Sequence, residues 1–130
     1  MKKLIITLCF ILTVCNLQAE NMNDEEVYSV SMIQLIATPE KYHGKWVKLI
    51  GVPCIDFEAD SIWLSLEHFK NKVYGNSIHL KIENVKINEY KKYNGKYVIL
   101  TGKFNKGKKG HMGMHKGSIS CIKRYDLWSK

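Results

Sequence analysis

The chain has 130 residues, enough for one domain of modest size and too few for several. Its 20 basic and 12 acidic residues give a formal charge of +8. The field of such a surface attracts nucleic acid, anionic lipid or acidic glycans, although a mildly cationic protein without such a partner has the same balance.

The first predicted element is a secretory signal peptide over residues 1–19. Two lysines precede an apolar stretch, Leu4–Val14, that is too short to span a membrane comfortably, and the small Ala19 fits a cleavage site. A lipoprotein anchored through Cys15 is less favoured, because a bulky valine precedes that cysteine. We therefore expect an exported protein, periplasmic or secreted, whose charge falls to +6 when the two lysines are removed.

The mature chain then divides into a leader and one domain. Residues 20–29 lack any periodic pattern and predict a flexible leader, so the domain is expected to span residues 30–130. Ser31 is a helix-capping residue followed by apolar side chains at helical spacing, which predicts a short helix from about Ser31 to Ala37. Pro39 and Gly44 end that helix.

Two similar decamers follow, YHGKWVKLIG (42–51) and YNGKYVILTG (93–102). In each, a turn dipeptide containing glycine leads into alternating apolar and polar residues, the pattern of a half-buried strand. Gly51 and Gly102 fall on the inward face, where glycine marks a sharp bend or a close approach of backbones, as small closed barrels require. We expect six positions to line the interior: Val47, Leu49, Leu64, Leu80, Val98 and Leu100.

Three further strands are predicted, at about residues 61–66, 77–82 and 114–124, with a short helical segment at residues 85–90. Three strands, a helical insertion and two more strands describe a mainly β, five-stranded Greek-key barrel of the oligonucleotide/oligosaccharide-binding (OB) type. The decamers thus recur because two strands meet the same task of turning inward, alternating and bending round a barrel.

The segments SMIQLIATPEKYHGKWVKLIG and GHMGMHKGSISCIKR resemble those of a family of small, mostly uncharacterised, exported bacterial OB-fold proteins. The resemblance covers residues 30–124 and implies the fold. It implies no reaction and no catalytic residue, since a fold does not determine a function. His115 departs from the family pattern, in which a bulky apolar or aromatic residue is more usual.

OB folds bind ligands on the face of their second and third strands, flanked by two loops. Here that surface predicts seven candidate ligand-binding residues: Trp63, His79, Lys81, Lys106, Lys108, Lys109 and His111. An aromatic platform beside cations suits single-stranded nucleic acid or an oligosaccharide, whereas acidic residues at 56, 58 and 60 oppose phosphate. In the alternative interpretation Trp63 covers the barrel end and the lysines belong to a solvated turn.

The sequence H-M-G-M-H at residues 111–115 contains two types of copper ligand, imidazole and thioether. In an extended strand the two histidines share one face and the two methionines the other, so they do not converge on one ion. We therefore expect no metal site and no cofactor, with a glycine-rich loop as the simpler interpretation.

Two cysteines, Cys54 and Cys121, remain in the predicted mature chain, and the sequence leaves open whether they form a disulfide. Ile119 and Ile122 cannot both face inward unless the last strand contains a bulge.

No nucleophile, zinc, phosphate-loop or dinucleotide motif is present, so we do not expect an enzyme. The predicted function is an exported binding module for an anionic polymer or oligosaccharide, single-stranded nucleic acid included. The alternative is a protein-interaction or envelope-stability module without a small ligand.

Overall fold

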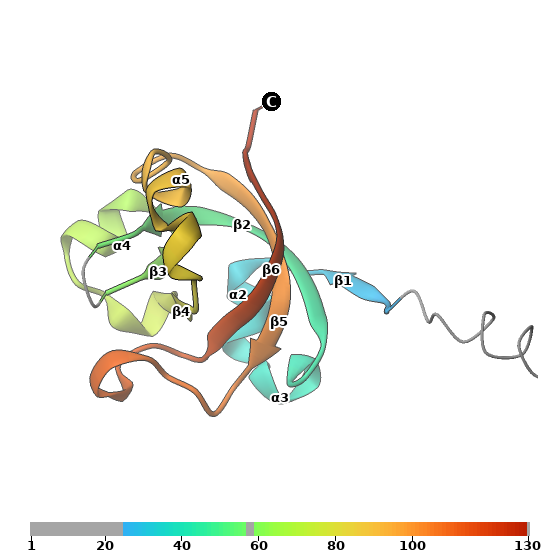
Figure 1. Ribbon diagram of the computed structural model, residues 1–130. Coiled ribbons are helices and arrows are strands. Elements are labelled where there is room, and N and C mark those ends of the chain that lie inside the picture. Colours follow the sequence, from blue (N-terminus) through green and yellow to red (C-terminus); the bar gives the residue numbers. More distant parts are fainter. Residues whose placement is uncertain (1–24, 57–58, 130) are drawn as a thin grey trace, which may run out of the picture.

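The computed structural model describes residues 25–56 and 59–129, so the predicted signal peptide and its cleavage site lie outside the described residues. Figure 1 shows the elements in chain order: β1 (Val27–Ser29), α2 (Met32–Ala37), α3 (Pro39–Tyr42), β2 (Trp46–Cys54), β3 (Ser61–Trp63), α4 (Leu66–Lys70), η1 (Tyr74–Asn76), β4 (Ser77–Leu80), η2 (Asn84–Lys86), α5 (Ile87–Lys91), β5 (Val98–Asn105), η3 (His111–Gly113) and β6 (Ser118–Leu127). In the part of the chain that the structure describes, no helix is both long and apolar enough to cross a membrane.

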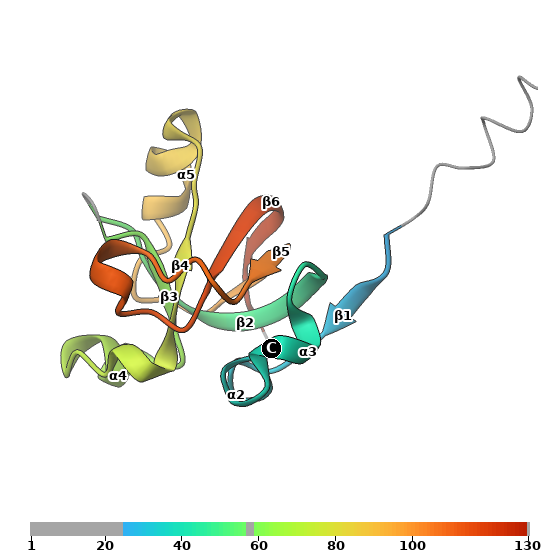
Figure 2. The ribbon, with the colours of Figure 1, turned by 90° about the horizontal axis from the view of Figure 1, so that it is seen from below.

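The protein is mainly β, and its strands form a closed barrel. Strands β2, β3, β4, β6 and β5 pair in that order, and pairing of β5 with β2 closes the ring. All of these pairs are antiparallel except β4 with β6. Viewed from below, the strands surround the interior while the helices lie around the outside (Figure 2). The prediction of a mainly β barrel with a few short helices is confirmed.

The two similar decamers pair with each other. Residues 46–51 of β2 run antiparallel to residues 98–103 of β5, with Leu49 opposite Leu100. Gly51 lies opposite Val98 and Val47 opposite Gly102, so each decamer places its glycine against the valine of the other. The repeat is thus a local pseudo-twofold arrangement around the Leu49–Leu100 pair.

Both repeated glycines lie where a neighbouring strand comes close, as predicted. A β-carbon at Gly51 would lie 2.7 Å from a side-chain carbon of Ile62 and 2.9 Å from the carbonyl oxygen of Trp63. A β-carbon at Gly102 would overlap Ile119 and lie 2.9 Å from the carbonyl oxygen of Ser120. These contacts occur because β3 and β6 cross the long strands β2 and β5 at the bends of the barrel.

The predicted interior is confirmed at five of the six positions. Val47, Leu80, Val98 and Leu100 have no exposed surface, and Leu49 is 2 % exposed. Leu64 is only half-buried and packs against the edge of this core. The reason is that β3 ends at Trp63, so the expected strand over residues 61–66 is too long and its second half turns into α4.

The predicted helices form. Ser31 caps α2 through a capping box: its hydroxyl accepts a hydrogen bond from Gln34 N at 3.1 Å, and the Gln34 side chain accepts one from Ser31 N at 3.0 Å. The segment predicted at residues 85–90 is helical as η2 and α5. It joins β4 to β5, where the insertion was expected.

Two boundaries differ from the expectation. Residues 27–29, predicted as part of a flexible leader, form β1, which runs parallel to residues 46–48 of β2. The last strand begins at Ser118 rather than near Met114, because left-handed residues at Gly110, Met112 and Gly113 turn the preceding chain. Regular structure is therefore present already at residues 27–29, and the loop before β6 is longer than periodicity alone predicts.

The bulge implied by Ile119 and Ile122 is present in β6. Pairing with β5 shifts between residues 101 and 103, and Cys121 has a left-handed φ of 52°. As a result Ile119 is fully buried and Ile122 also packs against the core.

Cys54 and Cys121 are both free thiols, the first buried and the second exposed. Cys121 faces outward because it is the bulged residue.

Candidate functional site

Trp63 does not form an exposed platform. Only 2 % of its surface is exposed, so the exposed platform is wrong and the alternative interpretation, in which Trp63 is covered, is confirmed. Its indole packs edge-on against Phe69 of α4, with ring centroids 5.6 Å apart, and against Tyr74 and His115. Its Nε1 donates a hydrogen bond of 2.7 Å to Ser61 Oγ. Folding of residues 65–76 into α4 and η1 covers Trp63, whereas His79 is half-buried and Lys81 is exposed.

The other candidate residues occupy several separate places. Lys106, Lys108 and Lys109 are exposed in the loop between β5 and β6, where Asn105 Oδ1 accepts hydrogen bonds from the backbone of Gly107 and Lys108. Lys81 lines a shallow depression beside Glu83 and Lys86. Lys106, Lys108 and Lys109 thus share one loop, which contacts His115 through a 3.1 Å hydrogen bond from His115 N to the carbonyl oxygen of Lys109 and passes close to His79 at Gly110, whereas Lys81 lies at a different depression.

A small pocket of about 110 Å³ brings a different subset together. Trp63 and His111 from the predicted site line it, with Tyr74, Met114 and His115. Met112 is instead 80 % exposed. The H-M-G-M-H segment is thus not extended, because η3 and its left-handed residues turn it so that His111, Met114 and His115 face the same pocket. The expectation that residues 111–115 are extended, with the histidines and methionines on opposite faces, is therefore wrong.

His115 is held by a hydrogen bond that determines its tautomer. Its Nδ1 lies 2.6 Å from Ser77 Oγ, and Ser77 Oγ donates its single proton to the carbonyl oxygen of Tyr74 at 2.7 Å. Ser77 must therefore accept from Nδ1–H, which leaves the Nε2 lone pair of a neutral imidazole available. Burial, and secondarily the nearby His79, lowers the pKa of His115 below its ordinary value and favours this neutral form.

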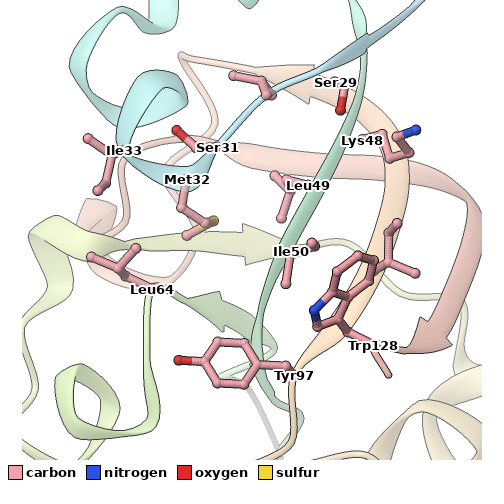
Figure 3. Close-up of a pocket in the computed structure, with 12 residues that line it drawn as sticks. Ser29, Ser31, Met32, Ile33, Lys48, Leu49, Ile50, Leu64, Tyr97 and Trp128 are labelled. Atoms are coloured by element: carbon pink, nitrogen blue, oxygen red, sulfur yellow. The ribbon is translucent and has the colours of Figure 1, made fainter. Parts of the chain in front are cut away.

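An apolar groove of about 560 Å³ lies on the outer face of the barrel (Figure 3). Its floor includes Ile50 and Ile99, which face each other across the β2–β5 pair. Its remaining lining comes from β1 and the start of α2, from β2, and from the residues that follow β3, precede β5 and follow β6: Ser29, Val30, Ser31, Met32, Ile33, Lys48, Leu49, Leu64, Tyr97 and Trp128. A concave, mainly apolar site of this size with a few polar groups is typical of ligand-binding sites.

Three large side chains at this groove remain exposed to solvent: Ile33 at 64 %, Tyr97 at 49 % and Trp128 at 46 %. The backbone N–H of Trp128 donates to the carbonyl oxygen of Tyr97 at 2.9 Å, so the segment after β6 is tied to the segment before β5. Among the described residues that line the groove, Lys48 alone carries a charge. The groove thus combines exposed aromatic and aliphatic surface with one cation.

The groove was not predicted from the sequence, although the two decamers contain a signal for it. Ile50, Tyr97 and Ile99 occupy outward positions of the two decamers, where a solvent-exposed barrel face would have polar residues. Ile33 is one of the apolar residues after Ser31 that predicted the helix, and it lies on the exposed side of α2.

Among the described residues, no three His, Cys, Asp or Glu side chains lie close enough together to hold a metal ion.

Compared with known proteins, the chain matches no family model, no curated protein and no solved structure. The geometry of the chain itself therefore carries the functional argument.

Proposed function

We propose that the protein is an exported, non-catalytic OB-fold module that binds an apolar, acidic segment of a protein partner in the groove of Figure 3. The closed strand order, with the helical segment between β4 and β5, supports the OB fold and its Greek-key path. The proposed membership of the small bacterial family rests on the resemblance of the sequence alone. The single observation that carries the function is the cluster of exposed Ile33, Tyr97 and Trp128 around one groove.

The chemistry of the groove indicates its occupant. Tyrosine and tryptophan are enriched among the residues that dominate the energy of protein interfaces, and they present large contact areas with few rotatable bonds. Lys48 is the one charge that faces the ligand, on a chain of net charge +8, so a carboxylate in the ligand is complementary. A peptide with apolar side chains and at least one Asp or Glu satisfies both features.

Selection from a random peptide library displayed on phage, with the purified chain immobilised, tests this proposal. We expect enriched peptides to combine apolar and acidic residues. Replacing Trp128 by Ala should weaken their binding by about 2 kcal/mol or more, which is about 30-fold, as for a central interface residue. The matched control is Val85→Ser, since Val85 is an 86 % exposed apolar residue that does not line the groove.

The other occupants give distinguishable outcomes. Dimerisation of the chain that disappears in Trp128→Ala would mean that a second copy covers the groove. Failure to enrich any peptide whose binding depends on Tyr97 or Trp128 would contradict the proposal.

Binding of an anionic polymer or oligosaccharide is the second candidate function. The exposure of Lys106, Lys108 and Lys109 in one loop favours it. Affinity for single-stranded DNA or an anionic glycan would then fall steeply with salt and depend on these lysines, because binding releases counterions. Burial of Trp63 weakens this candidate, since the base-stacking surface that it requires is covered.

A further inference from the structure

We propose that the pocket beside β4 is a binding site for a soft monovalent metal ion, Cu(I) or its analogue Ag(I), with His111, Met114 and His115 as ligands. The proposal concerns a pocket separate from the apolar groove and is independent of the peptide-binding function. It rests on the turn that brings these three side chains to one pocket and on the tautomer of His115.

The first argument is the kind of ligands present. Thioether sulfur and imidazole nitrogen are ligands that Cu(I) accepts, whereas the harder divalent ions prefer carboxylates. The pocket supplies two imidazoles and one thioether and no carboxylate among the described residues that line it.

The second argument is the orientation of His115. Histidines that bind metal usually donate their second ring N–H to an oxygen, which fixes the ring and its tautomer. Ser77 accepts from Nδ1–H of His115, and the tyrosine carbonyl in turn accepts from Ser77. This chain of hydrogen bonds presents the Nε2 lone pair without a proton to compete for it.

The third argument is the surrounding wall. The indole of Trp63 and the ring of Tyr74 line the pocket, so that much of its wall is aromatic. Lys72 lines it too, with its ammonium 4.5 Å from the centroid of the Phe69 ring. A nearby ammonium repels a divalent ion about twice as strongly as a monovalent one, because Coulomb energy scales with charge.

Methyl NMR of the full chain with labelled methionines tests the site. Ag(I) serves as the probe because, unlike Cu(I), it is not oxidised in aerated buffer. The thiols, which would compete for Ag(I), are removed by Cys54→Ala and by serine at the other three cysteines. We expect one equivalent of Ag(I) to shift the methyl resonance of Met114 and to leave that of Met112 unchanged. The thermal midpoint checks that the cysteine-free chain remains folded.

Three substitutions give the matched comparison. Met114→Leu and His111→Gln should each weaken Ag(I) binding by at least about tenfold. Loss of a residue that only hydrogen-bonds to a metal ligand already lowers metal affinity by about that factor, and loss of a ligand should lower it at least as much. Met112→Leu, two positions away on the exposed side of the turn, should leave the affinity unchanged. Equal shifts or equal losses at Met112 and Met114 would show binding to a flexible loop and overturn the pocket site, as would an unshifted Met114 resonance.

Discussion

Replacing Gly102 by alanine tests how the barrel closes. The added β-carbon would overlap Ile119 and lie 2.9 Å from the carbonyl oxygen of Ser120, which belongs to the β6 backbone and cannot rotate away. Because φ at Gly102 is not left-handed, the cost is steric rather than conformational. Overpacking of this kind destabilises by about 1–3 kcal/mol, a large fraction of the total stability of a small domain.

Gly75 provides the matched control. A β-carbon there has its nearest neighbour at 3.8 Å, the flexible end of Lys116, and φ is again not left-handed. Gly75→Ala should therefore be neutral or stabilise by about 0.4–1 kcal/mol through the unfolded chain. Gly51→Ala should resemble Gly102→Ala, since the two glycines occupy equivalent places in the paired decamers.

Urea unfolding of the three variants measures these effects. With a slope of about 2 kcal/mol per molar, a loss of about 2 kcal/mol lowers the midpoint of Gly102→Ala by about 1 M. A Gly102→Ala midpoint equal to that of Gly75→Ala would refute the close approach of β6 to β5 and with it the explanation of the repeat.

Three further predictions concern the core, the buried histidine and the thiols. Leu100→Ala should lower the free energy of unfolding by about 2–5 kcal/mol, because the side chain is fully buried, and an unchanged denaturation midpoint would contradict its position. The folded-state pKa of His115 lies below its ordinary 6.5, so the unfolded chain binds more protons and stability should fall as pH drops from about 7 towards 5. Replacing His115 with Phe should make the melting temperature depend less steeply on pH over this range, and an unchanged dependence would refute the assignment. Brief alkylation of the native chain, read by peptide mass mapping, should label exposed Cys121 well before Cys54, whose pKa burial raises to about 11, and equal labelling would contradict this order.

Alternating residues were enough to predict the interior of the barrel. The strands at 46–54 and 98–105 obey a period of two, and their inward side chains are buried as that period requires. The same pattern overextended the strand at Ser61, because Leu64 and Leu66 continue the alternation after the backbone has turned towards α4. The alternation of apolar and polar residues does not show where a chain leaves a sheet.

The candidate sites were less accessible to sequence reasoning. Trp63 alternates with inward residues and so was assigned outward, yet α4 and η1 fold over it. The groove assembles side chains from the two ends of the domain, Ile33 and Trp128 among them, and only the tertiary fold brings them together. The turn at Met112 depends on positive φ at a non-glycine residue, which composition does not reveal.

The claim that the groove binds an apolar, acidic peptide is tested most directly by titrating the labelled chain with a peptide selected on it and following the methyl resonances. We expect saturable shifts at the aliphatic side chains that line the groove, Ile33, Ile50 and Ile99, and loss of these shifts in Trp128→Ala. Shifts confined to the loop of Lys106, Lys108 and Lys109, or shifts at the groove that survive Trp128→Ala, would contradict the account.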